Sequence, residues 1–377
     1  MKVAFFTDTY LPHMDGVVRG ILNFKAELEK RRHSVYVFAP RGGPKIKSLL
    51  PQKRHFYYSS LSLPSYPQYH AALFPYHALK DVQKHNVQIV HSHSPATLGI
   101  AALGAAKTLH LPSLFSFHTF FSSATHYVVP TKHLQGAAGS ALWHYVRAYS
   151  SQFDLTTAPS TFAKEQLAQH GISSTVLPLG IDTKKFSPGA RDEKLLSSLG
   201  IPKNPKLIIS LGRVAQEKNL EVLLHAAPLV KKEHPDAFIL IGGKGPHLGK
   251  LRHAAARLGI NSYVKFPGFV PEEKIVPLYR SAHAFAFPSL FETQGLAALE
   301  ALSCGTPAVG AKNSASEDII NSSNGFLCSP NAHEFAHALG RILDSPQKYR
   351  NAARKSALYF DSSKRTDSLL SLYRKLV

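Results

Sequence analysis

Two glutamates, Glu292 and Glu300, lie eight positions apart in the stretch FETQGLAALE. Paired carboxylates can hydrolyse glycosidic bonds by acid–base chemistry, whereas carboxylates that act separately can bind sugar hydroxyls. The flanking residues locate the pair. HAFAFPS (283–289) is a predicted strand and GLAALEALSCG (295–305) a predicted helix, so Glu292 falls on the connecting loop and Glu300 inside the helix. The spacing leaves both kinds of chemistry open.

The start of that helix is a predicted anion site. Its first backbone N–H groups have no partner within the helix, and the helix dipole favours negative charge there. These groups belong to Thr293, Gln294, Gly295 and Leu296. A phosphate bound at this point would lie beside Glu292, with Glu300 about one and a half turns deeper.

Two basic residues follow a predicted strand in the segment SLGRVAQEKNLEVLL. Arg213 comes directly after the strand, and Lys218 lies at the entrance to the next helix. Together a guanidinium and an ammonium can neutralise a diphosphate, and the guanidinium adds a planar bidentate fork. Basic residues after strands are also common in solvated loops, so the pair alone is compatible with either role.

Glycines follow strands at two further points where the backbone could approach a phosphate. Gly243 lies in LIGGKGP, and Gly16 follows Asp15 in TDTYLPHMDGVVRG. LIGGKGP lacks the full GxGxxG dinucleotide spacing, and no GxxxxGK[ST] loop occurs in the chain. The lack of a GxxxxGK[ST] loop argues against a P-loop nucleotidase. Each glycine turn is a weak signal by itself.

Three histidines lie at the ends of predicted strands in the first half. His118 closes SLFSFH, at the carboxyl end of a strand, where parallel sheets bind their ligands. His91 and His93 follow another strand in VHSHSP. An HxH pair can bind zinc, but no third ligand lies at a persuasive spacing. Acceptor contacts and plain loop structure therefore both stay open for His91 and His93.

The charge balance favours a polyanionic partner. The chain has 44 Lys and Arg against 24 Asp and Glu, a net charge of +20. No acid occurs between positions 30 and 80, a window whose basic residues include Lys45, Lys47, Lys53 and Arg54. Such a stretch attracts nucleic acid, an anionic membrane or a phosphorylated substrate, although a solvated face is the simpler explanation. No zinc-finger spacing or RNP motif supports nucleic acid.

Length and composition indicate a two-domain protein. A chain of 377 residues is too long to fold around one hydrophobic core of ordinary size. Its composition, with 44% hydrophobic and 18% charged residues, is typical of a globular protein. Only Cys304 and Cys328 occur, so we expect a reducing, cytoplasmic setting. The start MKVAFFTDTY leaves no room for a signal-peptide core, and no run reaches the roughly 20 residues of a membrane span.

Short apolar runs alternate with amphipathic segments, which is typical of doubly wound α/β folds. The expected strands are KVAFFT, SVYVFA, VQIVH, SLFSFH, LTTAP and TVLPL, then KLIISLGR, AFILIGG, YVKFPGF, HAFAFPS, TPAVGA and GFLCS. Each series predicts one parallel sheet, in Rossmann-like domains over residues 1–180 and 190–355, joined by the Pro- and Gly-containing segment 177–194. The remaining stretch, 356–377, ends in a basic amphipathic helix that we expect to return to the N-terminal domain.

Taken together, the motifs of the second half resemble the GT4 family of glycosyltransferases. The matching stretches are GRVAQEKN, GGKGP, FPGFV (266–270) and FETQGLAALEALSCGTPAV. The resemblance implies a GT-B fold, in which two Rossmann-like domains face each other across a cleft, and an NDP-sugar donor. Arg213 and Lys218 would hold the donor diphosphate, Glu292 the hydroxyls of the transferred hexose and Glu300 the ribose diol. The glutamates are then binding residues rather than a hydrolytic pair.

The same resemblance implies further contacts. Backbone groups around Gly295 and Leu296 would touch phosphate or sugar, Phe269 and Val270 would line the base pocket, and His118 would lie near the transferred sugar. No Asp-x-Asp pair occurs that could clamp a metal against the diphosphate. We therefore expect donor binding without a metal or other cofactor, with cationic side chains and a helix N-terminus stabilising the leaving group.

A looser resemblance points to a lipid acceptor. SFHTFFSSATHYV, and ETQG where other relatives carry ETFG, resemble membrane-associated members that glycosylate diacylglycerol or phosphatidylinositol-type lipids. Residues 44–70 interleave basic side chains with Leu, Phe and Tyr, which suits an anionic bilayer surface. His93 and the basic residues Lys45, Lys47, Lys53 and Arg54 are the candidate acceptor and membrane contacts.

The sequence therefore predicts a retaining hexosyltransferase, peripheral to the inner face of the cell membrane. It would move glucose or mannose from UDP-glucose, GDP-mannose or a similar donor to a lipid hydroxyl. The diphosphate would leave on the face that the acceptor attacks and take the acceptor proton, so no protein nucleophile is needed. Two alternatives are a soluble GT4 transferase acting on a polysaccharide or small sugar, and a non-enzymatic nucleic-acid-binding protein.

Overall fold

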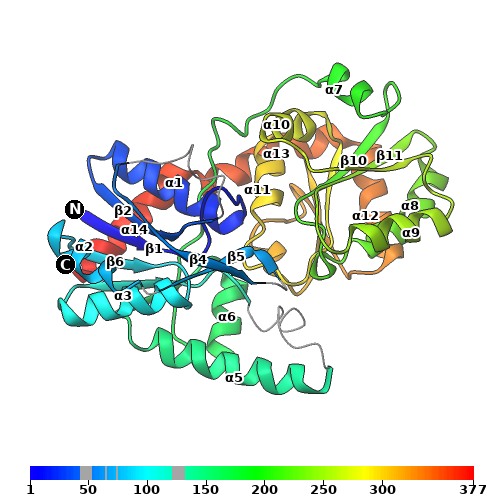
Figure 1. The fold of residues 1–377 in the computed structure, drawn as a ribbon. Coiled ribbons are helices and arrows are strands. Elements are labelled where there is room, and N and C mark those ends of the chain that lie inside the picture. The colour runs from blue at the N-terminus through cyan, green and yellow to red at the C-terminus, as the bar shows by residue number, and fades with distance from the viewer. Residues whose placement is uncertain (43–52, 64–65, 74, 121–131) are drawn as a thin grey trace. The chain divides into compact units, whose positions relative to one another are not determined.

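The chain forms two compact units, which we call unit 1 and unit 2. The structure is a computed structural model that describes residues 1–42, 53–63, 66–73, 75–120 and 132–377. Unit 1 comprises Met1–Gly180 with Ser362–Val377, and unit 2 comprises Ile181–Asp361 (Figure 1). Unit 2 is longer at both ends than the 190–355 expected from the sequence, because Ile181 and Phe360 are buried in its core.

Unit 1 is built on a seven-stranded sheet of order β3-β2-β1-β6-β7-β8-β9. All neighbouring strands in it are parallel. The strands are β1 (Lys2–Phe6), β2 (Ser34–Pro40), β3 (His55–Tyr58), β6 (Ile89–Ser92), β7 (Ser113–Ser116), β8 (Leu155–Ala158) and β9 (Thr175–Val176). A separate antiparallel hairpin is formed by β4 (Ser60–Leu63) and β5 (Tyr66–Ala72).

Helices cover the sheet of unit 1. They are α1 (Gly16–Lys30), α2 (His77–Lys84), α3 (Thr97–Thr108), α5 (Lys132–Ser150), α6 (Thr161–Gln169) and α14 (Ser362–Leu376). Because side chains alternate along a strand, Ala4 and Phe6 of β1 point to one face, where they join a core cluster with residues of α2 and α3. The C-terminal helix α14 packs against α1 (Figure 1). None of the described helices combines the length and apolar character needed to cross a bilayer.

Part of the basic window is a strand, which corrects the expectation for residues 44–70. In β3, Phe56 stacks on Phe38 of β2 at 4.8 Å between ring centroids, and Tyr58 is only 9% exposed. Aromatic residues favour strands because they pack well on a half-buried sheet, so these two serve the core rather than a bilayer. Lys53, Arg54 and Leu61 are exposed, whereas Lys45 and Lys47 lie outside the described residues.

Unit 2 contains a six-stranded sheet of order β12-β11-β10-β13-β14-β15, again with all neighbours parallel. Its strands are β10 (Lys206–Leu211), β11 (Ala237–Gly242), β12 (Val264–Gly268), β13 (Ala284–Phe287), β14 (Ala308–Ala311) and β15 (Gly325–Cys328). Its helices are α7 (Glu193–Ser198), α8 (Glu221–Glu233), α9 (Leu248–Arg257), α10 (Glu272–Ser281), α11 (Leu296–Ser303), α12 (Ala332–Asp344) and α13 (Pro346–Ala357), with 3-10 turns η3 (Gln216–Lys218), η4 (Ala315–Asp318) and η5 (Leu358–Phe360).

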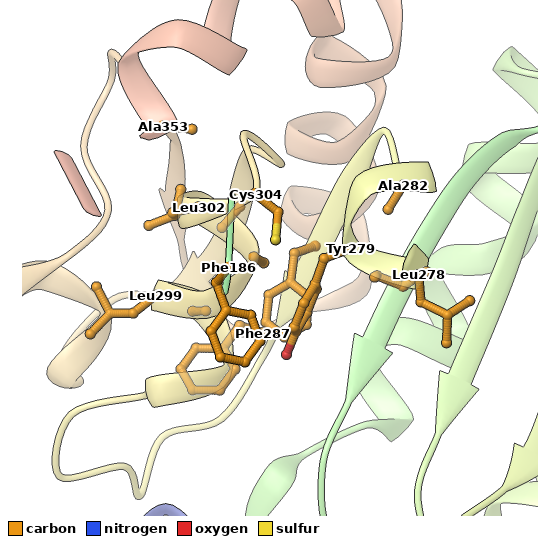
Figure 2. Close-up of a cluster of buried hydrophobic side chains, with 14 of the residues drawn as sticks. Phe186, Leu278, Tyr279, Ala282, Phe287, Leu299, Leu302, Cys304 and Ala353 are labelled. Atoms are coloured by element: carbon orange, nitrogen blue, oxygen red, sulfur yellow. The ribbon is translucent and has the colours of Figure 1, made fainter. Parts of the chain in front are cut away.

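The core of unit 2 has two layers, one on each face of the sheet. Side chains alternate along β13, so Phe285 and Phe287 lie in the cluster beneath α10, α11 and α13, which Figure 2 shows. Ala284 and Ala286 point to the other face and lie in the cluster beneath α8 and α12. A parallel sheet must be covered on both faces, which accounts for the nearly continuous apolar runs in its strands. The two parallel sheets confirm the predicted α/β fold class.

Candidate functional site

The strand order of unit 2 changes direction between β10 and β13. β10 pairs with β11 on one side and with β13 on the other. In open parallel sheets, ligands bind outside the carboxyl ends of the strands at such a switch point. The loop after β10 carries Arg213 and leads to Lys218, and the loop after β13 carries Glu292. The topology thus brings the predicted donor-site residues of both loops to one edge of the sheet.

Each cation of this site contacts a carboxylate. Lys218 Nζ donates a hydrogen bond to Glu292 Oε1, which joins residues 74 positions apart, and Arg213 forms an ion pair with Glu217. The four side chains are only 17% to 27% exposed, so these pairs are shielded more than ordinary surface pairs. The structure therefore brings Lys218 and Glu292 together, as a shared ligand requires.

Glu217 belongs to this site although the sequence analysis did not single it out. Burial by itself would raise its pKa, but hydrogen bonds and the charge of Arg213 outweigh burial and hold the pKa below its usual value. Its carbonyl accepts a hydrogen bond of 3.2 Å from Ser289 Oγ, which attaches η3 to the loop after β13. The available signal was an acid next to Lys218 in the motif AQEKN.

Glycines allow the loops after β10 and β11 to pack backbone against backbone. A Cβ on Gly243 would lie 1.7 Å from the carbonyl oxygen of Gly212, and one on Gly245 would lie 2.0 Å from that of Val214. Gly243 also has φ 144°, a conformation that favours glycine. The Gly243 turn predicted from the sequence therefore has a packing reason, and its proposed contact with phosphate stays a prediction.

The helix that follows Glu292 begins where the sequence analysis expects. α11 starts at Leu296, and Gly295 precedes it with φ 89°. A Cβ at Gly295 would lie 2.8 Å from the ring of Phe287, so no larger residue fits there. Gln294 is 3% exposed, whereas Thr293 is half-buried on the same loop.

The two glutamates of the opening motif have different partners. Glu292 contacts Lys218, whereas Glu300 is 5% exposed and its Oε2 accepts a hydrogen bond of 3.2 Å from the hydroxyl of Tyr279. The two carboxylates of a hydrolytic pair lie on either side of one glycosidic bond. Glu292 and Glu300 are instead held by different side chains. The arrangement favours two binding carboxylates.

Phe269 and Val270 differ in their surroundings. Phe269 is 64% exposed, with Lys244 Nζ 5.7 Å above its ring, whereas Val270 packs against the core of unit 2. An exposed aromatic ring beside a cation offers a flat surface for stacking. The base-pocket role expected for the two residues remains a prediction.

Unit 1 has its own switch point, between β1 and β6, and a buried carboxylate bridges it. Asp8 follows β1 and is 0% exposed. Its oxygens accept hydrogen bonds from Ser94 Oγ at 2.5 Å, Thr97 Oγ1 at 2.9 Å and the Leu98 backbone N–H at 3.0 Å. Burial raises the pKa of Asp8, and these hydrogen bonds oppose the rise. Asp8 was not among the residues predicted from the sequence, although an acid directly after a buried strand is a visible signal.

The three histidines predicted at strand ends, His91, His93 and His118, form one buried cluster in unit 1. His93 Nδ1 lies 3.0 Å from His118 Nε2, and the rings of His91 and His93 are 3.9 Å apart. Their exposed fractions are 0% for His91, 2% for His93 and 9% for His118. His91 in turn lies 2.7 Å from the Tyr373 hydroxyl of α14. His91 lies within β6 and His93 directly follows it, and both are buried, while their contact with an acceptor stays a prediction.

Burial keeps this histidine cluster neutral. It lowers the pKa of His118 to about 4 and the pKa values of His91 and His93 well below their ordinary value. Neutral rings can donate one hydrogen bond and accept another, which suits positioning more than proton transfer near pH 7. In the described part of the chain, no three His, Cys, Asp or Glu side chains are arranged to hold a metal ion.

The predicted turn at Asp15-Gly16 is the start of α1. Asp15 caps this helix, because its Oδ1 accepts a hydrogen bond of 2.8 Å from the backbone N–H of Val18. Gly16 is the exposed first residue of the helix. The turn therefore has a structural role, and its phosphate contact stays a prediction.

Two family descriptions match most of the chain, one in each half. "Glycosyltransferase Family 4" matches residues 14–185 and "Glycosyl transferases group 1" matches residues 191–358. The chain is also 29% identical, over 85% of its length and 73% of the relative, to an alpha-monoglucosyldiacylglycerol synthase of Streptococcus pneumoniae. It is 32% identical, over 59% of its length and 58% of the relative, to a GDP-mannose-dependent phosphatidylinositol dimannoside mannosyltransferase of Mycobacterium tuberculosis.

Solved structures share the fold over the whole chain. The Anabaena protein HepE, in complex with UDP and glucose, superposes with a TM-score of 0.78 at 19% identity and covers 100% of both chains. A similarity at this level of identity establishes the architecture alone.

Proposed function

The chain belongs to glycosyltransferase family 4, and from this membership we propose that it transfers a hexose from an NDP-sugar to a lipid hydroxyl at a membrane surface. The observation that carries the proposal is the group of Arg213, Lys218 and Glu292 at the switch point of unit 2. Relatives named for diacylglycerol and phosphatidylinositol glycolipids support the lipid acceptor.

In the proposed donor site, Arg213 and Lys218 bind the diphosphate. Glu217 and Glu292 now hold these two cations, so an incoming diphosphate would compete with carboxylates for them. Glu292 would then be available to accept hydrogen bonds from hexose hydroxyls, while buried Glu300 binds the ribose. We propose that no divalent metal is needed, since two cations and the start of α11 can offset the diphosphate charge.

The proposed transfer retains the anomeric configuration. The bond from the anomeric carbon to the diphosphate oxygen breaks, and the acceptor oxygen bonds to that carbon on the same face. The departing diphosphate takes the acceptor proton, so the step balances without a protein base. For unit 1 we propose acceptor binding at the carboxyl edge of its sheet, where neutral His118 lies.

We further propose that the protein attaches peripherally to the cytoplasmic face of the membrane. Residues 1–180 carry 17 basic and 7 acidic side chains, 17 − 7 = +10, which favours an anionic surface. Lys53 and Arg54 are exposed, and Leu61 on the β4–β5 hairpin is 63% exposed. Exposed cations and an exposed apolar side chain both suit the headgroup region of a bilayer.

An activity screen tests the proposal. The protein is incubated with UDP-glucose, GDP-mannose and other NDP-hexoses, with diacylglycerol or phosphatidylinositol vesicles, and NDP release and lipid products are measured. The Arg213→Ala protein sets the background. We expect lipid-dependent NDP release, a glycolipid product and full activity in EDTA. Release that depends only on a soluble sugar would assign a different acceptor, no release from any donor would refute the transferase, and loss in EDTA would refute the metal-free site.

A further inference from the structure

Glu300, the proposed ribose ligand, is itself held by a tyrosine from another helix. Tyr279 lies on α10 and Glu300 on α11, 21 positions apart, and the tyrosine hydroxyl donates to Glu300 Oε2 at 3.2 Å. Both residues are buried, with Tyr279 1% and Glu300 5% exposed. A buried carboxylate needs hydrogen-bond donors, and this hydroxyl is one of them.

The ring of Tyr279 is fixed from several sides. The ring meets Phe285 edge-on at 5.8 Å and Phe186 at 6.2 Å between centroids. The backbone carbonyl of Tyr279 accepts a hydrogen bond of 2.5 Å from Thr306 Oγ1. Figure 2 shows the ring within the apolar cluster, near Phe186. A ring held this firmly fixes the position of its hydroxyl oxygen, so a carboxylate oxygen bonded to that hydroxyl is held in place as well.

We propose that Tyr279 is a positioning residue that orients the Glu300 carboxylate for the ribose of the nucleotide. This inference rests on the proposed donor site and adds a residue to it. A vicinal diol needs a carboxylate whose plane is set before binding, because each hydroxyl must meet a lone pair. Tyr279 sets that plane through Oε2 and does not itself touch the ligand. Pre-orientation of this kind avoids an ordering cost when the nucleotide binds.

Tyr279→Phe tests the proposal, because it removes one hydroxyl and keeps the ring. The probes are UDP and GDP with their 2′-deoxy and 3′-deoxy counterparts, and calorimetry measures the preference for the ribose form. The wild-type protein should prefer the ribonucleotide. In Tyr279→Phe this preference should fall about tenfold, since a bond to a charged group is lost. Glu300→Gln, in which Tyr279 is intact, should also reduce the preference.

Tyr349→Phe is the matched control, because Tyr349 is similarly buried at 5% exposure but lies in the other core cluster. It should leave the ribose preference unchanged. If Tyr279→Phe lowers thermal stability while the ribose preference persists, Tyr279 is merely structural and the proposal is overturned. If wild-type protein binds neither UDP nor GDP, the donor site itself fails. If Glu300→Gln keeps the full preference, the ribose ligand lies elsewhere and the positioning role falls with it.

Discussion

Replacing Glu292 with glutamine is expected to separate nucleotide binding from sugar transfer. In the structure Lys218 already contacts Glu292, and the two side chains are 27% and 17% exposed. A diphosphate must draw Lys218 away from this carboxylate. A partly exposed pair of this kind contributes about 1 kcal/mol, the upper end of the range for surface ion pairs, so the neutral variant should bind UDP or GDP about fivefold more tightly.

Transfer should change in the opposite direction. Glu292→Gln weakens a charged acceptor for the hexose hydroxyls, and a hydrogen bond to a charged group contributes about 1.5–3 kcal/mol. The kcat/KM for the NDP-sugar should therefore fall roughly 10- to 100-fold. Unlike Arg213→Ala, which should weaken both properties, this variant should show tighter nucleotide binding and slower transfer together.

Two measurements decide the outcome. Calorimetry with UDP and GDP gives the nucleotide affinity, and steady-state NDP release gives kcat/KM. Glu233→Gln removes the same charge from the exposed end of α8 and should change neither quantity. If Glu292→Gln bound nucleotide as poorly as Arg213→Ala while transfer continued, the assigned roles of the glutamate and the cations would be refuted.

Two further predictions concern unit 1. Burial lowers the pKa values of its clustered histidines, that of His118 to about 4. Their contribution to the free energy of unfolding should therefore be fully present above the unfolded pKa of about 6.5 and should be lost as the pH falls towards 4. The loss should be roughly 3 kcal/mol for His118 alone. Urea midpoints followed by fluorescence of Trp143, the only tryptophan, should fall on acidification, and constant midpoints would contradict neutral burial. Vesicle sedimentation should require anionic lipid and weaken with salt, and Lys53→Gln with Arg54→Gln should reduce it about tenfold or more, while Lys232→Gln on unit 2 should not. Equal binding to neutral vesicles would contradict electrostatic attachment.

Much of the fold was predictable because its signals are local. The runs KLIISL and AFILIG became β10 and β11, and Gly295 precedes the helix LAALEALS as expected. Such runs report whether a segment is buried on both faces, which depends on near neighbours in the chain. The same reasoning failed for residues 55–58, where mixed basic and aromatic side chains concealed the edge strand β3.

The sequence predicted some residues of the candidate site and missed others. Arg213, Lys218 and Glu292 stood out because charged groups follow strands whose carboxyl ends share an edge. Asp8 and Glu217 did not stand out, since one acid beside a strand or a lysine is common in any sequence. Tyr279 gave no signal at all, because a tyrosine on an apolar helix face is ordinarily core.

Residue order alone predicted two parallel α/β units and a cationic site in the second half, and it carried motifs that resemble a known family. Folding in three dimensions decided the partners: Lys218 with Glu292, Tyr279 with Glu300, and a histidine cluster joined to the C-terminal helix. Periodicity is a property of neighbouring residues, so a sequence displays it directly. Hydrogen bonds demand heavy atoms about 3 Å apart, and only the packing of distant segments brings such atoms that close.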